Sequence, residues 1–463
     1  MEIKQLYTNC LAEAAYYIEC CEEAAIIDPI RDIEQYIQLA QERGKKIKYI
    51  FETHFHADFV SGHIDLAART GAQIIYGPNA NTNYKVYNAK DGEEFKVGKI
   101  KIKALHTPGH TLESTSYLLI DKEGKDNAIF TGDTLFVGDV GRPDLLDGSG
   151  ITKEFLAEKM YESLNSKIKP LADDVIVYPA HGPGSACGKN IGKETWSTIG
   201  QQKKSNYYLI EMDKQKFIET LTTGIAPPPK YFFEDARINK EGYSNIDSIV
   251  ERNKKPLSLT DFEKEIANGT LILDTRNADD FEKGFIPGAI NIGLNGQYAN
   301  WIGTLIHIEQ PIVLVCDVGK EEESIVRAAR VGYENFKGFL SGGINSWINA
   351  GKKSEQIKSI TPEQFAADVR SNSFTTLDVR KESEFENGHV KNALLFPLGD
   401  VNANTSSLDK SKQYVIHCAG GYRSMIAASL LKAKGVTNVV NVYGGYSKIK
   451  DTGVEIEMPV SKT

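Results

Sequence analysis

The chain contains little cysteine, tryptophan and methionine for its length, and no long apolar run. Six cysteines in 463 residues are too few for a disulfide framework, so we expect free thiols in a reducing, cytoplasmic compartment. No apolar stretch approaches the ~18 residues that a membrane span needs, and the first residues lack the apolar segment of a signal peptide. We therefore expect no membrane partner.

The chain also lacks a concentration of positive charge. It carries 54 basic and 62 acidic residues, a formal charge of -8, and no block or helical stripe of Lys and Arg. A nucleic-acid-binding surface needs such a concentration, so we expect no nucleic acid as a partner. The length is enough for roughly three domains of about 150 residues each, and we expect a homo-oligomer.

A proline-rich segment separates the first domain from the rest of the sequence. The stretch "IAPPPKYFF" holds three consecutive prolines, which continue neither a helix nor a central strand. We therefore expect a linker near residues 225–256, after a first domain at 1–235.

Beyond this segment the sequence repeats itself. "LDTRNADDFEKGFIPGAINI" from Leu273 matches "LDVRKESEFENGHVKNALLF" from Leu377, and Cys316 corresponds to Cys418. In both copies short apolar runs such as "PIVLVC" and "YVIHC" alternate with helical patterns, which is typical of β-α units around a parallel sheet. The sequence therefore predicts two α/β domains of one kind, at 257–355 and 358–460.

In the first domain, metal-binding residue types follow several strand-like runs directly. His54, His110, Asp133 and His181 come after "IKYIFET", "IKIKALHTPG", "NAIFTG" and "DVIVYPA". A lone histidine is usually a structural residue, but a set of such residues at successive strand ends is what a metal site on an αββα sandwich needs. The pattern predicts a metalloenzyme domain.

The motifs "THFHADFVSGH", "HTPGHT", "FTGDTLF" and "YPAHG" resemble the metallo-β-lactamase superfamily, in its branch of glyoxalase II-like enzymes and persulfide dioxygenases. The continuation "GDVGRPDL", which contains Arg142, is similar to the dioxygenases in particular. In two-metal members of this superfamily, His56 would join the ligands of the first ion. The second ion would use Asp58, a histidine directly after it, and His181, with Asp133 bridging.

Here Phe59 replaces the histidine that the second ion requires, so we expect one metal ion per chain. Two histidines and one carboxylate form the facial triad of non-haem Fe(II) oxygenases, and the resemblance implies one Fe(II) as cofactor. Its expected ligands are His54, His110 and Asp133. The expected neighbours, which orient ligands, waters or substrate, are His56, Asp58, His181 and Arg142. A zinc-dependent thioester hydrolase of the glyoxalase II kind stays open as the alternative.

The segment "CAGGYRS" lies between an apolar strand and a helix in the last domain. Its backbone N–H groups can surround the Cys418 sulfur at a helix N-terminus, where a thiolate or a sulfur anion is stabilised. We expect Cys418 to be the nucleophile, with Arg423 beside it. The remaining members of this expected sulfur-anion loop are Ala419, Gly420, Gly421, Tyr422 and Ser424.

Together with "LDVR", "FENGH" and a downstream glycine pair, this loop resembles that of a rhodanese sulfurtransferase. The central copy reads "CDVGKEEES" instead, which places Glu321 opposite Arg423 and Asp317 beside Cys316. Carboxylates there would raise the pKa of the thiol and repel anionic sulfur donors. We therefore expect residues 257–355 to be a pseudo-rhodanese with a structural or docking role, while slow sulfur transfer by the retained Cys316 stays open. Cys187 either lines the iron pocket or is a buried turn residue.

The whole chain resembles a fusion of a persulfide dioxygenase with tandem rhodanese domains. This resemblance implies that O2 oxidises a small thiol persulfide to sulfite at the iron, and that Cys418 transfers sulfur between persulfide, sulfite and thiosulfate. The direction of that transfer and the carrier thiol stay open. A scaffold or sulfur-carrier protein without catalysis is the other class, and it would require an unreactive Cys418.

Overall fold

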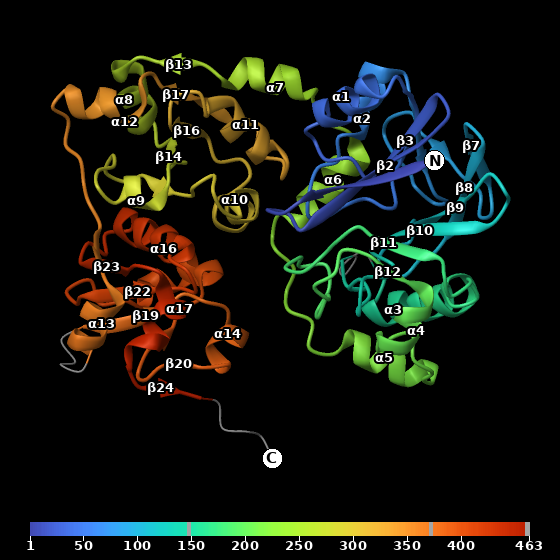
Figure 1. Cartoon of the computed structure of the whole chain (residues 1–463). Coiled ribbons are helices and arrows are strands. Elements are labelled where there is room, and N and C mark those ends of the chain that lie inside the picture. Colours follow the sequence, from blue (N-terminus) through green and yellow to red (C-terminus); the bar gives the residue numbers. More distant parts are fainter. Residues whose placement is uncertain (146–149, 370–373, 459–463) are drawn as a thin grey trace. The chain divides into compact units, whose positions relative to one another are not determined.

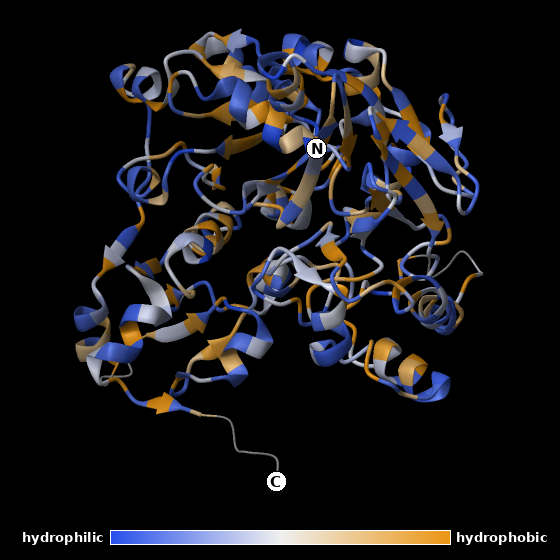
Figure 2. Ribbon diagram, turned by 45° about the vertical axis from the view of Figure 1, so that its right-hand side comes forward, coloured by the Kyte–Doolittle hydropathy of each residue, from blue (hydrophilic) through white to orange (hydrophobic). Residues whose placement is uncertain are grey.

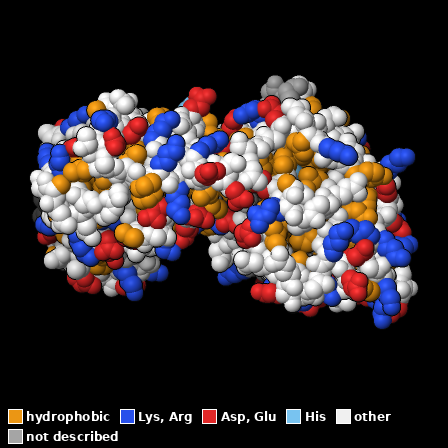
Figure 3. All heavy atoms as spheres, turned by 90° about the horizontal axis from the view of Figure 1, so that it is seen from above, with side chains coloured by type: hydrophobic (Ala, Val, Ile, Leu, Met, Phe, Trp, Pro, Cys, Tyr) orange, Lys and Arg blue, Asp and Glu red, His pale blue; other side chains and the backbone are white. Residues whose placement is uncertain are grey.

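The computed structural model describes residues 1–145, 150–369 and 374–458, in two units (Figure 1). The first unit comprises Met1–Ile249 together with Ala329–Gly332, and the second comprises Val250–Ala328 and Tyr333–Thr463. Among the described residues, no helix is both long and apolar enough to cross a membrane. On the face that Figure 3 shows, acidic and basic side chains are interspersed.

The first unit contains a sheet with the strand order β1-β2-β3-β4-β5-β6. Its strands are β1 (Glu2–Thr8), β2 (Glu13–Cys20), β3 (Glu23–Ile27), β4 (Lys46–Phe51), β5 (Gln73–Tyr76) and β6 (Tyr87–Asn88). The strands β1, β2 and β3 pair antiparallel, whereas β3, β4, β5 and β6 pair parallel. The parallel strands therefore present their C-terminal ends at one edge of the sheet.

A second sheet of the same unit has the order β12-β11-β10-β9-β8-β7. Its strands are β7 (Glu94–Val97), β8 (Ile100–His106), β9 (Thr115–Ile120), β10 (Asp126–Gly132), β11 (Ile176–Pro179) and β12 (Ser197–Thr198). The two sheets share an apolar core, in which Tyr16 and Phe51 of one sheet pack with Tyr117 and Phe130 of the other. In Figure 2, hydrophobic and hydrophilic segments both occur along the strands of the molecule.

Helices cover the outer faces of both sheets. The helices α1 (Glu34–Glu42) and α2 (His63–Thr70) lie against β4, and α3 (Lys153–Ser163) and α5 (Lys214–Thr222) pack over the second sheet. Side chains cap two of these ends, because Thr152 accepts from Phe155 N and Asp213 accepts from Lys216 N. The expected αββα sandwich is confirmed.

The proline-rich segment does not mark the end of the first unit. Helix α6 (Phe232–Glu241) belongs to the first unit, as does the start of α7 (Ile246–Asn253). The buried Asn239 of α6 donates to the carbonyls of His56 and Phe59 at 2.8 and 2.7 Å. The three prolines come before α6. This helix then bonds to the segment that contains His56 and Phe59, so it is part of the first unit and not of a linker.

The central part of the second unit is a sheet of parallel strands in the order β13-β17-β16-β14-β15. Its elements in chain order are β13 (Pro256–Leu257), α8 (Leu259–Ala267), β14 (Leu271–Asp274), α9 (Ala278–Phe281), β15 (Ile290–Asn291), α10 (Tyr298–Leu305), β16 (Ile312–Val315), α11 (Glu321–Ala329), β17 (Phe336–Leu340) and α12 (Gly343–Asn349). The last residue of α11 lies in the first unit.

The C-terminal part repeats this topology in the order β18-β23-β22-β19-β21, again with parallel pairing. Its main elements are β18 (Lys358–Ile360), α13 (Pro362–Val369), β19 (Thr375–Asp378), α14 (Glu382–Glu386), β21 (Leu394–Leu395), α15 (Val401–Asn404), β22 (Tyr414–His417), α16 (Tyr422–Ala433), β23 (Val439–Val442) and α17 (Gly445–Ile449). A short antiparallel ribbon joins β20 (His389–Val390) to β24 (Ile456–Glu457). The expected pair of parallel α/β domains is confirmed.

Candidate functional sites

The first unit gathers buried polar side chains just beyond the ends of its strands. His54 follows β4, Asp133 follows β10, and His181 follows β11, while His110 lies in the loop after β8. All four are at most 2% exposed. Buried polar groups of this kind are stable only if they are paired or bind an ion.

Three atoms of this group face one another without a hydrogen-bond partner among the described residues. Nε2 of His110 lies 3.3 Å from Oδ2 of Asp133, and Nε2 of His54 lies 3.9 Å from the same oxygen. The three atoms lie within 4.8 Å of one another. Two imidazole nitrogens and one carboxylate oxygen in this arrangement fit a transition-metal cation.

Neighbouring groups fix the tautomer of both histidines. Thr53 Oγ1 donates its single proton to Oδ2 of Asp28 at 2.8 Å, so it can only accept the bond from Nδ1 of His54 at 2.9 Å. Nδ1 of His110 donates to the backbone oxygen of Arg142 at 2.8 Å. Both rings therefore carry their proton on Nδ1 and direct an unprotonated Nε2 toward Asp133, as metal ligands require.

The electrostatics of the cluster agree with a metal site. Burial, and then the neighbouring His56, holds the pKa of His54 well below its ordinary value, so this ring is neutral. Burial opposes ionisation of Asp133, but His181, His110 and His54 outweigh it and hold the pKa of Asp133 far below its ordinary value. The protein thus supplies two histidines and one carboxylate, with His54 neutral and Asp133 ionised.

Close packing fixes the backbone beside these ligands. A Cβ on Gly141 would lie 2.1 Å from the Asp133 carbonyl oxygen and 2.9 Å from Nδ1 of His110. Only glycine fits at this point. The adjacent Arg142 carbonyl can therefore reach His110, while the Arg142 side chain pairs with Asp144. Arg142 thus contacts His110 through its backbone oxygen and not through its side chain.

A second group of donors adjoins the triad. His181 bridges two carboxylates, with Nδ1 2.8 Å from Asp133 Oδ1 and Nε2 2.8 Å from Asp58 Oδ2. The buried Cys187 lies close enough to complete a further set of potential ligands with Asp58 and His181. Phe59 adds no donor here, because its side chain has no N, O or S atom. Its fully buried ring packs on the ring of His56, with the two centroids 4.3 Å apart.

His56 is oriented away from the triad. Its Nε2 lies 3.1 Å from Asp28 Oδ1 and 3.8 Å from Glu52 Oε2, and its ring packs on His54 at 4.2 Å between centroids. It therefore affects the ligands through packing and charge. Sequence reasoning missed Asp28 and Glu52, although Asp28 directly follows the apolar run "AAII" just as the recognised residues follow theirs.

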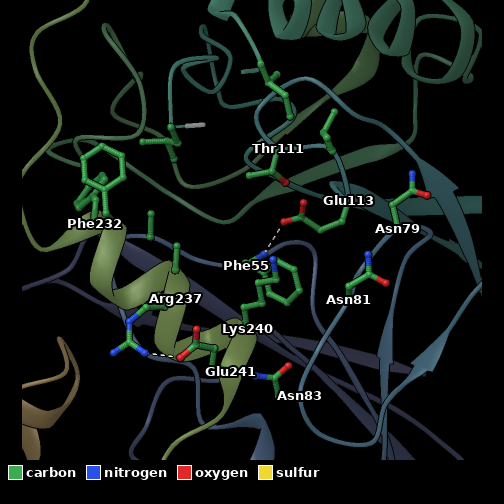
Figure 4. A pocket seen from close by; sticks show the side chains of 16 residues that line it. Phe55, Asn79, Asn81, Asn83, Thr111, Glu113, Phe232, Arg237, Lys240 and Glu241 are labelled. Atoms are coloured by element: carbon green, nitrogen blue, oxygen red, sulfur yellow. Dashed lines mark hydrogen bonds and ion pairs between the residues drawn. The ribbon is translucent and has the colours of Figure 1, made fainter. Parts of the chain in front are cut away.

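The first unit contains a cavity of about 840 Å³, and Figure 4 shows the side chains that line it. Four of the lining residues, Phe55, Ala57, Thr111 and Glu113, lie within three positions of His54 or His110 in the sequence. The alternating residues Asn79, Asn81 and Asn83, together with Phe232, Phe233, Ala236, Arg237, Lys240 and Glu241 of α6, complete much of its lining. The lining is thus partly apolar, and its polar part consists of amide and charged side chains. Because α6 falls in the expected linker, sequence reasoning missed this wall.

In the C-terminal domain, Cys418 lies between the end of β22 and the start of α16. Its sulfur is buried, accepts from Gly421 N at 3.1 Å and lies 3.6 Å from Ser424 Oγ. The sulfur therefore lies within the predicted loop at a helix N-terminus, which stabilises negative charge. Arg423 does not complete this loop. Both of its terminal nitrogens bind the carboxylate of Glu384, at 2.6 and 2.8 Å.

The corresponding loop of the central domain is acidic. Burial first, and then Glu321, Asp274 and Asp317, raise the pKa of the Cys316 thiol to about 12. A thiol with this pKa is protonated at neutral pH and is a poor nucleophile. The two homologous cysteines therefore have different neighbours, since a backbone N–H donates to Cys418 whereas carboxylates lie near Cys316.

Comparison with protein families gives two matches. Residues 8–181 match the metallo-beta-lactamase superfamily, and residues 258–350 and 361–452 each match the rhodanese-like domain. The crystal structure of a metallo-beta-lactamase from Staphylococcus aureus subsp. aureus COL is similar along most of the chain. The two are 34% identical, and the match covers 73% of this chain and 98% of that one, with a TM-score of 0.65.

Curated relatives match the first domain. A probable hydroxyacylglutathione hydrolase of Schizosaccharomyces pombe is 35% identical over 173 residues, which are 36% of this chain and 62% of that protein. A cytoplasmic hydroxyacylglutathione hydrolase of Arabidopsis thaliana is 34% identical over 184 residues, which are 39% of this chain and 67% of that protein. Neither alignment reaches half of this chain.

Proposed function

Because this chain belongs to the metallo-beta-lactamase superfamily and carries two rhodanese-like domains, we propose that it oxidises a small thiol persulfide with O2 and transfers the sulfur onward through Cys418. The oxidation is written RSSH + O2 + H2O → RSH + SO3²⁻ + 2H⁺. Oxygen is reduced, and the outer sulfur of the persulfide is oxidised to sulfite.

The observation that carries this proposal is the set of three unpartnered atoms, Nε2 of His54, Nε2 of His110 and Oδ2 of Asp133. These residues would hold one Fe(II), which when bound supplies open coordination positions for a sulfur anion and for O2. Thr53 and the Arg142 carbonyl hold the two rings in the required tautomer. Phe59 withholds the imidazole that a second ion would need.

The cavity of the first unit would hold the carrier thiol. Its amide-lined wall can bond to polar groups of the carrier, and Phe55 and Phe232 offer apolar contact. The persulfide end would then reach the metal ligands past Phe55 and Thr111, which adjoin His54 and His110 in the chain. This arrangement would place the carrier in the cavity and its sulfur at the buried cluster.

Cys418 would carry out the second step. Attack of its thiolate on the outer sulfur of RSSH breaks the S–S bond of the carrier, releases RS⁻ and leaves a persulfide on Cys418. Sulfite then attacks that outer sulfur, giving thiosulfate and regenerating the Cys418 thiolate. The Gly421 N–H near the sulfur would offset the negative charge as the two anions meet.

The second candidate is hydrolysis of a thioester such as a hydroxyacylglutathione, which the names of the curated relatives suggest. The potential ligand set of Asp58, His181 and Cys187 favours it, because a second ion there would give a two-metal hydrolase. Phe59, which supplies no donor atom beside Asp58, favours the one-metal proposal, and Nδ1 of His181 already bonds to Oδ1 of Asp133 at 2.8 Å.

Metal analysis of protein purified without oxygen tests the proposal. We expect about one iron per chain, O2 uptake with glutathione persulfide, and little hydrolysis of S-lactoylglutathione. Asp133→Ala should abolish metal binding and O2 uptake while sulfur transfer at Cys418 persists, because the two sites lie in different units. Asp126→Ala, at the start of the same strand β10, is the matched control and should behave as wild type.

Two equivalents of zinc with rapid thioester hydrolysis would instead establish the hydrolase. Loss of both O2 uptake and sulfur transfer in a folded Asp133→Ala variant would contradict the assignment of separate active sites.

A further inference from the structure

The loop that contains Cys418 makes a direct contact with the central rhodanese-like domain of the same unit. The hydroxyl of Tyr422, four residues after the cysteine, donates to the backbone oxygen of Gly293 at 2.7 Å. Gly293 follows the strand β15 of the central domain. Tyr422 is also the first residue of α16, so this contact lies at the helix end that holds the sulfur.

A second glycine of the central domain lies against the tyrosine ring. A Cβ on Gly296 would come within 2.4 to 2.6 Å of three atoms of the Tyr422 ring. The φ of Gly296 is not positive, so the ring contact, rather than the backbone conformation, requires glycine here. The segment from Gly293 to Gly296 therefore forms a close-fitting seat for this side chain.

The contact continues along α16. Asn291 N donates to Oγ of Ser429 at 3.0 Å, and both residues are buried. The central domain thus binds the helix at its first residue through Tyr422 and again two turns later through Ser429. Two hydrogen bonds, two turns apart, fix the position of the helix relative to β15.

The cysteine loop is held on its other side by its own domain. Tyr446 N donates to the Cys418 carbonyl at 2.6 Å, and Ser447 N donates to the Ala419 carbonyl at 3.0 Å. Gly445 permits this approach, because a Cβ there would lie 2.3 Å from the Cys418 carbonyl oxygen. These bonds anchor the start of the loop, and the Tyr422 hydroxyl anchors its end.

The cysteine loop of the central domain differs at the equivalent position. Lys320 occupies the position that corresponds to Tyr422, and its side chain pairs with Glu323 on its own helix. Val318 in the same loop is 80% exposed. The loop of Cys418 therefore contacts the central domain through a tyrosine, whereas the loop of Cys316 has a lysine at the equivalent position.

We propose that the central rhodanese-like domain is a positioning domain, which holds the sulfur-binding loop of Cys418 in its working geometry through Tyr422. This inference rests on the proposed role of Cys418 in sulfur transfer. The Tyr422 hydroxyl does not touch the reacting sulfur. It fixes the end of the loop from which Gly421 N reaches that sulfur, so loss of the contact lets the amide move away from the sulfur.

The full-length chain with Tyr422→Phe tests this role, because the change removes only the hydroxyl. We expect kcat of thiosulfate sulfurtransferase to fall roughly three- to tenfold, as loss of one hydrogen bond implies. Gly296→Ala, which lies in the other domain and forces the ring out of its seat, should produce the same defect. The control Gly284→Ala adds a methyl group that meets only Ile348, at 3.8 Å, and should leave kcat unchanged.

Alkylation of Cys418 separates positioning from a general loss of folded protein. The loop amides favour an anionic reagent, so the ratio of iodoacetate to iodoacetamide rates at Cys418 measures their alignment. We expect Tyr422→Phe and Gly296→Ala to lower this ratio, whereas Cys316→Ser should change neither the ratio nor the turnover. An unchanged ratio in both variants would overturn the proposal, whether or not kcat falls.

The variant Cys418→Ser distinguishes failure of the positioning role of Tyr422 from failure of the proposed sulfur transfer. If Cys418→Ser retains sulfur transfer, the proposed chemistry is wrong. If Cys418→Ser is inactive while Tyr422→Phe and Gly296→Ala match wild type, the chemistry holds and the positioning role is wrong.

Discussion

The two rhodanese-like domains share one buried framework. In the central domain Arg276 binds Asp274 at 2.6 Å and the Gly284 carbonyl at 3.0 Å. In the C-terminal domain the equivalent arginine and aspartate are also 2.6 Å apart, and the arginine reaches its glycine carbonyl at 2.9 Å. The same strand order surrounds both pairs. The two copies therefore share this buried arginine–aspartate arrangement as well as their strand order.

The domains differ in the few residues around their cysteines. Cys418 accepts an N–H bond from Gly421, whereas Cys316 lies near the carboxylates of Glu321, Asp274 and Asp317. The difference shows that the framework and the reactive loop are separable. The buried arginine and aspartate maintain the sheet, and the short segment between strand and helix determines whether the thiol can react.

The largest effect that this comparison predicts is on Cys418→Ser. We expect sulfur transfer to be abolished, because serine cannot carry a persulfide, while O2 uptake persists. Given glutathione persulfide and O2, the variant should accumulate sulfite where wild type forms thiosulfate, and chromatography of both anions measures this. Thiosulfate formation at the wild-type rate, after subtraction of the spontaneous reaction, would remove Cys418 from the mechanism.

A second prediction tests whether the shared framework contributes equally in both domains. Arg276→Ala and Arg380→Ala each leave a buried aspartate without its partner, so each should lower the free energy of unfolding of its domain by about 3–5 kcal/mol. Denaturant titration measures this change. Lys283→Ala and Lys391→Ala remove exposed ion pairs in the same domains and should cost about 1 kcal/mol or less. If the buried and the exposed pairs lowered the free energy of unfolding equally, the buried arginine–aspartate pairs would not be the stabilising framework of these domains.

The smallest predicted effect concerns the pH dependence of Cys316. Its thiol has a pKa of about 12, so below that pH it is mostly protonated, and its alkylation should rise about tenfold per pH unit between pH 8 and 11. Glu321→Gln removes one of the charges that raise this pKa and should increase alkylation at pH 8 about threefold. Mass spectrometry of the Cys316 peptide measures both. Rapid alkylation of wild-type Cys316 at pH 7 would contradict the conclusion that its thiol is protonated and unreactive at neutral pH.

Much of this organisation was predictable because it depends on local pattern. The repeat appears directly in matched segments, and apolar runs followed by His54, Asp133 or Cys418 mark strand ends where side chains converge. The prediction of a linker at 225–256 was wrong because prolines report only local backbone restriction. The buried bonds of Asn239, which attach α6 to the metal motif, join residues about 180 positions apart.

By itself the sequence determined the domain order, the strand ends that carry the polar residues, the replacement at Phe59 and the acidic loop after Cys316. These features depend on residue type and short spacing, which act within one strand, turn or helix. The tertiary structure alone decided that Arg423 pairs with Glu384 and that His56 faces Asp28. It also decided that α6 lines the cavity and that the Tyr422 hydroxyl bonds to the Gly293 oxygen. These contacts join segments far apart in the chain, and side-chain direction and close packing, which spacing does not encode, select the partner.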